Sequence, residues 1–322
     1  MKIDLSILKQ SSNFEVILYT LLLLALWLLF RFFASSLSNI ISFFGARQLK
    51  VDPFLNGVIY PVSYWTERGG RPYQEDRFYM MKAAGIDASL YGVFDGHGGH
   101  LAAQYCKEYL LQCIASDPEW ESSPPRAISR SFKKVDSEFS GKAKAQTLND
   151  GTTAIVAAFH AGKIYVGNAG DSRAIVVQKG GRCKVMSMDH RPDRKDEENR
   201  IKKLGGKIIY WGRWRVEGVL AVSRAIGDVS FQPYITAEPE IIEKSIEPDD
   251  EYLVLATDGL WDVMENEDVA RYVLNSRKDF LNISKKLCSE SLILGSSDNV
   301  TVLVIDIKKR EIVHHQQSRN EK

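Results

Sequence analysis

The chain has 322 residues, of which 44% are apolar, and its 42 Lys and Arg nearly balance its 41 Asp and Glu. This near-zero net charge excludes a protein held to nucleic acid by a basic face. The 26% of charged and 10% of aromatic residues exclude a disordered chain. We expect one large domain or two small ones, with a sizeable core and no nucleic-acid partner.

The first notable element is an apolar stretch at 16–30, VILYTLLLLALWLLF, which carries no charge. Its eleven Leu, Ile, Val and Phe residues favour membrane insertion by about 3 to 7 kcal/mol. At about 1.5 Å per residue the stretch is about 22 Å long, and extension to residue 34 brings it to about 28 Å of a hydrocarbon layer of about 30 Å. We expect a leader at 1–15, a transmembrane signal-anchor helix at 16–34 and a juxtamembrane linker at 35–60.

Basic residues at 31, 47 and 50 follow this stretch without a nearby acid before Asp52. By the positive-inside rule, a single-pass anchor would then leave the C-terminal part in the cytosol. A cleaved secretory signal, a buried helix and organelle targeting are the alternatives. Because the first thirty residues hold two acids and no Arg, they do not favour a mitochondrial presequence. A mitochondrial or a soluble cytosolic location remains the alternative to the membrane.

From residue 62 onward, short apolar runs typical of strands recur at 62–67, 76–81, 90–94, 152–159, 163–169, 173–178, 252–258 and 299–307. Apolar residues at three- and four-residue spacing predict helices over 101–115, 125–139, 268–274 and 280–294. Strands without strict alternation with helices indicate an α+β fold. We expect the folded domain at 61–308 and a flexible tail at 309–322.

The four cysteines lie far apart, without a C-x-x-C pair, so they indicate neither a structural zinc site nor a disulfide scaffold. None is followed by Arg six positions later, which excludes a phosphate-binding C-x5-R loop with a catalytic thiolate. A reducing compartment suits these residues. They are Cys106, Cys113, Cys183 and Cys288.

Acidic residues stand directly beside several of the predicted strands. If even three of them converge, each pair of like charges about 4 Å apart costs about 4 kcal/mol at an effective dielectric constant near 20, so a cation is required. Oxygen ligands without cysteine favour magnesium or manganese. A single Asp-Gly after a strand is by itself more often a turn. The acids are Glu75, Asp76, Asp95, Asp171, Asp258, Asp262 and Asp298.

Seven segments, in this order, resemble the signature segments of the metal-dependent type 2C Ser/Thr protein phosphatases. They are RPYQEDRF (71–78), VFDGHGG (93–99), GTTA (151–154), NAGDSRA (168–174), LAVSRAIGD (220–228), ATDGLWD (256–262) and SSDNVT (296–301). The resemblance covers about residues 62–307, and the apolar N-terminus is similar to that of the membrane-anchored branch. It implies a central β-sandwich of two mainly antiparallel sheets flanked by helices, and a catalytic domain that acts on phosphorylated proteins. We expect this domain to be monomeric.

The resemblance also implies the ligands of two Mg²⁺ or Mn²⁺ ions. Asp95 should bridge both ions, the Gly96 carbonyl should complete one site, and Asp258 and Asp298 should hold the other. A third, weaker ion should bind at Asp171 together with Asp258 and Asp262. Further acids are expected to bind the metal of the first site or its water: Glu75 and Asp76.

Two further positions match the groups that handle the substrate. Arg71 should bind the phosphate, for which a planar guanidinium with two parallel donors is suited. His97 should protonate the leaving seryl or threonyl oxygen, since an imidazole with a pKa near 6.5 is a suitable acid. By the same resemblance, the two divalent ions would supply the hydroxide that attacks phosphorus, so no protein nucleophile would be needed. Arg224 and Asp228 match framework positions.

Two other functions use the same features. A catalytically weak scaffold of this fold would hold phosphoproteins at a membrane, and a two-metal phosphodiesterase or nuclease would need a basic groove that the charge balance does not suggest.

The charge run at 190–203 predicts an exposed helix with alternating signs. In the resembling family, the segment next to it is a flap beside the active site, which could shape substrate choice.

Overall fold

The computed structural model describes residues 57–82, 88–309 and 311–313, and all of them belong to one compact unit. The predicted leader, the predicted anchor helix at 16–34 and nearly all of the predicted linker lie outside the described residues. Within the ranges that are described, no helix combines the length and the apolar character needed to cross a membrane.

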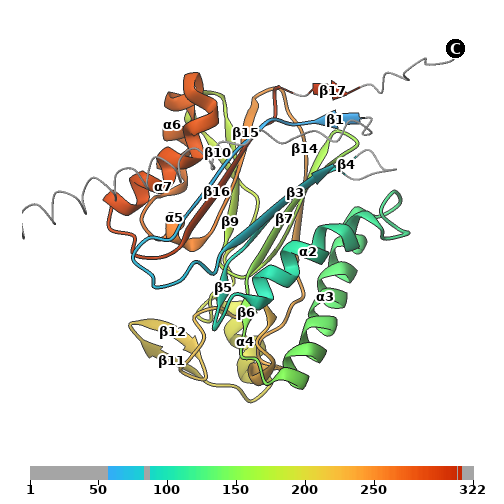
Figure 1. Ribbon diagram of the computed structural model, residues 1–322, viewed down its shortest axis with the longest axis vertical. Coiled ribbons are helices and arrows are strands. Elements are labelled where there is room, and N and C mark those ends of the chain that lie inside the picture. Colours follow the sequence, from blue (N-terminus) through green and yellow to red (C-terminus); the bar gives the residue numbers. More distant parts are fainter. Residues whose placement is uncertain (1–56, 83–87, 310, 314–322) are drawn as a thin grey trace, which may run out of the picture. The chain divides into compact units, whose positions relative to one another are not determined.

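Two five-stranded antiparallel sheets form the centre of the domain (Figure 1). The first sheet has the order β10-β9-β15-β16-β2, and the second has the order β14-β8-β7-β4-β3. The strands of the first sheet are β10 (Cys183–Val185), β9 (Arg173–Gln178), β15 (Asp250–Ala256), β16 (Val300–Asp306) and β2 (Val62–Glu67). Those of the second are β14 (Glu240–Ser245), β8 (Lys163–Ala169), β7 (Ala154–His160), β4 (Ala88–Phe94) and β3 (Arg77–Lys82).

The central strands are continuous apolar runs because both of their faces are covered. All residues of β4, β15 and β16 are buried. Alternate side chains go to different cores: Tyr91 and Val93 of β4 pack between the two sheets, whereas Leu90 and Phe94 pack under helices. This period of two follows from the pleat of a strand. The result is a sandwich with three apolar layers, as the predicted α+β architecture requires.

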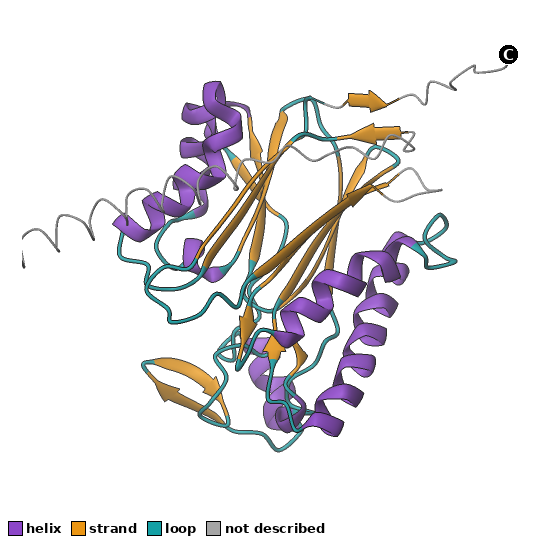
Figure 2. Ribbon diagram, viewed as in Figure 1, coloured by secondary structure: helices purple, strands orange, loops and turns teal. Residues whose placement is uncertain are grey.

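A pair of helices covers the outer face of each sheet (Figure 2). Helices α2 (Leu101–Ala115) and α3 (Pro124–Gln146) pack on the second sheet, while α6 (Asn266–Ser276) and α7 (Ile283–Ile293) pack on the first. The prediction for 101–115 is confirmed at both ends. The helix predicted at 125–139 continues to residue 146, and the one predicted from residue 280 begins only at 283, after the 3-10 turn η3 (Arg277–Asn282).

The remaining elements are short. They are β1 (Gly57–Ile59), β5 (Gly96–His97), β6 (Gly151–Thr152), η1 (Lys179–Gly181), α4 (Lys195–Lys203), β11 (Ile208–Trp211), β12 (Arg213–Val216), β13 (Ile226–Gly227), η2 (Val229–Phe231), α5 (Asp258–Trp261) and β17 (Glu311–Val313). Strands β5, β6 and β13 form a small sheet next to the sandwich, and β11 and β12 form a hairpin that stands beside it (Figure 1).

The structure corrects two sequence predictions. Strand β1 pairs antiparallel with β17, and the Tyr60 ring packs on Phe159, so the folded unit begins before residue 61 and the tail after 308 contains a strand. The segment 190–203, predicted as an exposed helix, is helical only from residue 195, where α4 begins. Most side chains of α4 are exposed or half-buried, but Glu197 and Ile201 are buried, and Ile201 belongs to a small core beneath the hairpin.

Candidate functional site

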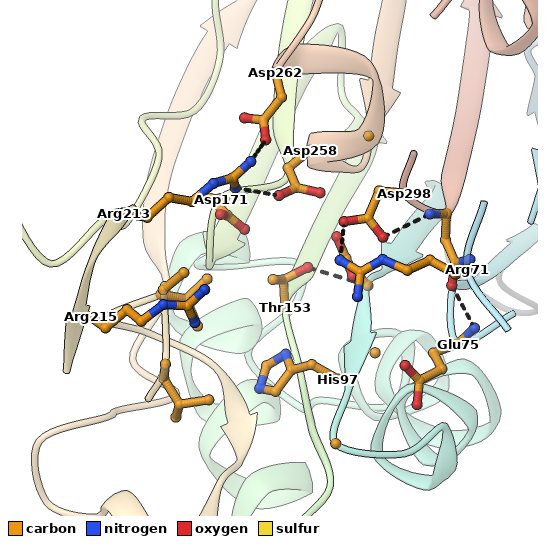
Figure 3. Close-up of a pocket in the computed structure, with 18 of the residues that line it drawn as sticks. Arg71, Glu75, His97, Thr153, Asp171, Arg213, Arg215, Asp258, Asp262 and Asp298 are labelled. Carbon is orange, nitrogen blue, oxygen red and sulfur yellow. Dashed lines mark hydrogen bonds and ion pairs between the residues drawn. The ribbon is translucent and has the colours of Figure 1, made fainter. Parts of the chain in front are cut away.

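One cavity of about 950 Å³ opens where strand ends of both sheets meet, close to the β11–β12 hairpin (Figure 3). With the exception of Asp76, every residue predicted for the site lines this cavity. Residues separated by more than two hundred positions therefore meet on one surface. They are Arg71, Glu75, Asp95, Gly96, His97, Asp171, Asp258, Asp262 and Asp298.

Antiparallel pairing explains why these acids converge. Ala256 near the end of β15 pairs with Val302 near the start of β16, which places Asp258 and Asp298 at the same end of the first sheet. In the second sheet β4 ends before Asp95, whose carbonyl oxygen accepts a hydrogen bond of 2.9 Å from the Thr153 amide. Each acid thus follows or precedes a buried strand that cannot shift without exposing its apolar side chains.

Desolvation and mutual repulsion make negative charge costly on several of these acids. Burial, followed by repulsion from Asp76 and Asp258, raises the pKa of Asp95 well above its usual value. Burial, then repulsion from Asp258, raises the pKa of Asp171 to about 8, and burial with repulsion from Asp262 raises that of Asp258 to about 6. Such a set of oxygen donors fits divalent cations, which would stabilise the charged forms.

Asp76 lies behind the cavity wall and does not line it. Its Oδ2 accepts hydrogen bonds from the hydroxyls of Thr301 at 2.7 Å and Thr257 at 3.1 Å, and its Oδ1 is buried without a partner. Burial raises the pKa of Asp76 to about 7. Glu75, the adjacent acid that was predicted for the same role, does line the cavity, and its amide donates a hydrogen bond to Asn299 Oδ1 at 2.8 Å. The two adjacent acids therefore face different surroundings.

The chain's own arginines already contact several of the acids (Figure 3). Arg71 Nη2 lies 2.6 Å from Asp298 Oδ2, and Arg213 of the hairpin pairs with Asp262 and, at 3.5 Å, with Asp258. Among the residues that the structure describes, no three His, Cys, Asp or Glu side chains converge into a cage around one ion. The side chains are arranged as carboxylate and guanidinium pairs along the cavity wall.

His97 has a specific carboxylate partner that was not predicted for it. Its Nε2 lies 2.7 Å from Oδ2 of Asp228, which is buried. Burial alone would lower the pKa of His97, but the charge of Asp228 and the hydrogen bond to it raise the pKa above 6.5. Asp228, expected only as a framework residue, therefore orients the predicted acid and holds a proton on it.

Three arginines near the hairpin were missed in the sequence. Arg213 and Arg215 line the cavity, and Arg191 donates to Asp262 Oδ1 at 2.8 Å. The signal that could have found them is the alternation in 213–216, RWRV, which puts both arginines on one face of a strand.

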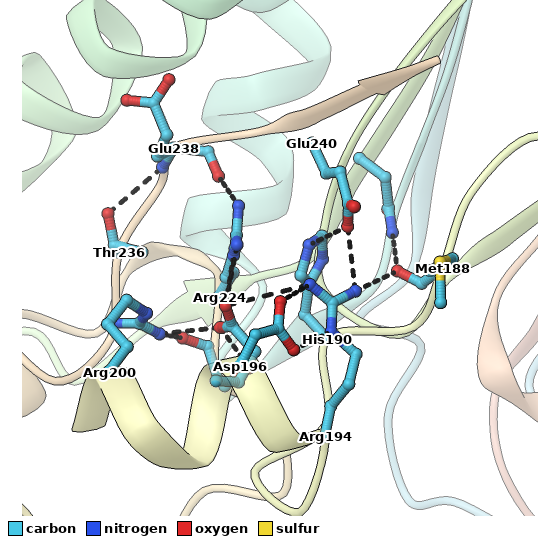
Figure 4. Close-up of polar contacts among 12 residues, drawn as sticks. Met188, His190, Arg194, Asp196, Arg200, Arg224, Thr236, Glu238 and Glu240 are labelled. Atoms are coloured by element: carbon cyan, nitrogen blue, oxygen red, sulfur yellow. Dashed lines mark hydrogen bonds and ion pairs between the residues drawn. The ribbon is translucent and has the colours of Figure 1, made fainter. Parts of the chain in front are cut away.

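Arg224 has the framework role that was expected (Figure 4). Its Nη2 lies 2.7 Å from Oε1 of Glu197, whose other oxygen accepts from Arg200 and Ser223. Nearby, buried His190 lies 3.1 Å from Oε2 of Glu240. This network ties α4 to segment 223–225 and so supports the base of the hairpin.

Taken together, the cavity combines a set of carboxylates that fits divalent cations, a guanidinium and an imidazole with a raised pKa. A hydrolase of phosphate esters that works with divalent cations requires these groups. The sequence model of the family described as "Protein phosphatase 2C" matches residues 73–300. The chain belongs to this family of metal-dependent serine/threonine protein phosphatases.

Individual relatives agree. The chain is 44% identical over 246 residues to a probable protein phosphatase 2C member 13, mitochondrial, of Oryza sativa subsp. japonica, covering 75% of this chain and 67% of the relative. It is 42% identical over 245 residues to the probable protein phosphatase 2C 52 of the same organism, covering 75% of this chain but only 49% of that relative. The solved serine-threonine phosphatase 2C of Toxoplasma gondii has a TM-score of 0.71 and 26% identity, with 77% of this chain and 94% of that one covered.

Proposed function

We propose that this chain hydrolyses phosphoserine and phosphothreonine in proteins with two Mg²⁺ or Mn²⁺ ions, and that a third ion binds more weakly. The convergence of six predicted carboxylates with Arg71 and His97 in one cavity supports this proposal. Asp95, the Gly96 carbonyl, Asp258 and Asp298 are assigned to the two ions. The weaker ion is assigned to Asp171, Asp258 and Asp262.

When bound, the divalent ions supply an activated water and neutralise charge on the phosphoryl group. The protein groups do the rest. Arg71, more than half exposed at the rim, binds two phosphate oxygens through its planar guanidinium. Its carboxylate partner Asp298 then becomes available to a metal ion. His97, held by Asp228, keeps a proton that it donates to the leaving seryl or threonyl oxygen.

The test is phosphate release by the full chain, purified in detergent because of its apolar stretch at 16–30. Phosphoserine peptides should be hydrolysed with added Mn²⁺ and should not be hydrolysed after chelation. A phosphodiester under the same conditions should release nothing, which separates a monoesterase from a nuclease. Turnover that persists without divalent metal would refute the proposed mechanism.

The proposed phosphatase is tethered to a membrane by residues 16–34, with its catalytic domain in the cytosol. The uncharged run at 16–30 and the basic residues at 31, 47 and 50 support this orientation. The rice relative named as mitochondrial supports the alternative location. Protease protection of a C-terminal tag in intact cell membranes tests the topology: the tag should be digested from the cytosolic side and the chain should resist alkaline extraction.

A further inference from the structure

The β11–β12 hairpin carries a guanidinium to the acids that were assigned to the weaker ion. Arg213 contacts Asp262 through Nη2 and Asp258 Oδ2 through Nη1, at 3.5 Å for the second pair. Among the ion pairs of the described residues, these two join the hairpin to the acids of the cavity. Figure 3 shows its side chain reaching across from the hairpin to both carboxylates.

The two faces of the hairpin make different contacts. Ile209 pairs with Arg215 and Trp211 pairs with Arg213, so these four residues share the face that turns to the cavity. On the opposite face Val216 is buried in the small core with Ile201. The hairpin is thus anchored at its base by apolar packing, whereas its tip is held over the cavity by Arg213.

Arg215 is a natural reference for Arg213. It lies on the same face and lines the same cavity, but among the described contacts its guanidinium donates only to the Val219 carbonyl, not to a carboxylate. The hairpin therefore offers two arginines of which one pairs with the acids and one does not. A change of net charge can be separated from the loss of a specific pair by comparing them.

We propose that Arg213 is a positioning residue that bridges Asp258 and Asp262 as an internal cation, and that a divalent ion binding to these acids displaces it and frees the hairpin tip. We call the three residues the Arg213 latch. The proposal rests on the metal-binding part of the proposed function. It adds that metal occupancy and hairpin position are coupled.

The coupling follows from competition for the same oxygens. A guanidinium and a divalent ion compete for the carboxylates of Asp258 and Asp262. The apparent metal affinity therefore falls as the fraction of molecules with a closed latch rises. The Arg213 side chain is half exposed, which limits the pair to the range of surface ion pairs. Opening the latch should therefore raise the affinity for the weaker ion about fivefold, or about 1 kcal/mol.

Calorimetric titration of the full chain in detergent with Mn²⁺ measures this directly. Arg213→Ala should bind the weaker ion about fivefold more tightly than the wild type. Arg213→Lys should fall between the two, because an ammonium keeps the charge but cannot bridge two carboxylates in the same fork. Arg215→Ala is the matched control and should change the affinity less than twofold, since it removes a charge without breaking a carboxylate pair.

Tryptophan emission reports the hairpin without reference to turnover. Mg²⁺ should shift the emission contributed by Trp211, obtained by subtracting the spectrum of Trp211→Phe, because this side chain pairs across the hairpin with Arg213. In Arg213→Ala the emission of Trp211 should already lie at the metal-bound position and should not respond to Mg²⁺. Thermal unfolding of each variant confirms that it is folded.

The outcomes separate the two proposals. If the wild type binds no divalent ion, the proposed function fails and the latch fails with it. If the wild type binds Mn²⁺ but Arg213→Ala binds it with the same affinity, or if Arg215→Ala gains as much affinity as Arg213→Ala, only the latch is refuted. An emission of Trp211 that does not move with Mg²⁺ also overturns it.

Discussion

Glu197 offers the clearest test of the physical account of the fold. It lies in α4 with a side chain that is only 1% exposed, and it accepts hydrogen bonds from Arg224 at 2.7 Å, Arg200 at 2.8 Å and Ser223 at 2.7 Å. Burial alone would raise the pKa of Glu197, but these donors outweigh burial and lower it to about 2 from 4.5. The carboxylate is thus a charged anchor under the hairpin.

Replacement by Gln keeps the shape and removes the charge. The arginines around it then lose their counter-charge. Removing one partner of a buried ion pair typically lowers the free energy of unfolding by about 3 to 5 kcal/mol. The lowered pKa agrees, because a shift from 4.5 to about 2 corresponds to about 3 kcal/mol. For a domain of this size, Glu197→Gln should lower the melting temperature at pH 7 by about 6 to 12 °C.

The assay is thermal unfolding of wild type and Glu197→Gln between pH 7 and pH 2. A group whose pKa is lower in the folded state stabilises the protein above its unfolded pKa, and this contribution is lost as the pH falls from about 4.5 toward 2. The difference between the two proteins should shrink over this window. The neighbouring Glu198→Gln, whose partners Lys195 and Lys202 lie at the surface, is the control and should melt close to the wild type. Equal melting temperatures for Glu197→Gln and wild type at pH 7 would refute the reasoning.

Three further predictions concern the cavity. Asp95→Asn and Asp258→Asn should lower phosphatase turnover by several orders of magnitude. The metal-free melting temperature should not fall, since each change removes a partly desolvated charge that neighbouring carboxylates repel. A near-normal rate in either variant would remove that residue from the site. His97→Ala should impair hydrolysis of phosphoserine peptides more than that of aryl phosphates, whose leaving groups need no proton, and equal losses on both substrates would argue against a general acid. Gly259→Ala should abolish folding of this region, read as lost protection of its amides from hydrogen exchange, because a Cβ would lie 2.1 Å from the Asn299 carbonyl oxygen.

Much of the secondary structure was predictable because it is local. The runs 62–67, 163–169 and 173–178 coincide with β2, β8 and β9 at both ends. Strands β8 and β9 are buried beyond their first residue and are apolar in their centres, whereas β2 is a half-buried edge strand that its aromatic and β-branched residues predict. Strand β14 was missed because its residues, EIIEKS, include three charges and only two apolar residues, a composition that an edge strand tolerates but that resembles a loop. Strand β1 pairs with β17 from the other end of the domain, and no local sequence pattern predicts such a long-range pairing.

The sequence by itself identified the acids, the arginine and the imidazole that, apart from Asp76, line one cavity, because their motifs and the family resemblance name those positions. Only the tertiary structure decided how they are used: that Asp228 orients His97, that Asp76 faces Thr257 and Thr301 behind the cavity, and that Arg213 bridges two of the acids. Strand propensity and apolar period act over a few residues, whereas each of these contacts joins distant segments. Their geometry depends on how the two sheets pack, and this is set by the whole core at once.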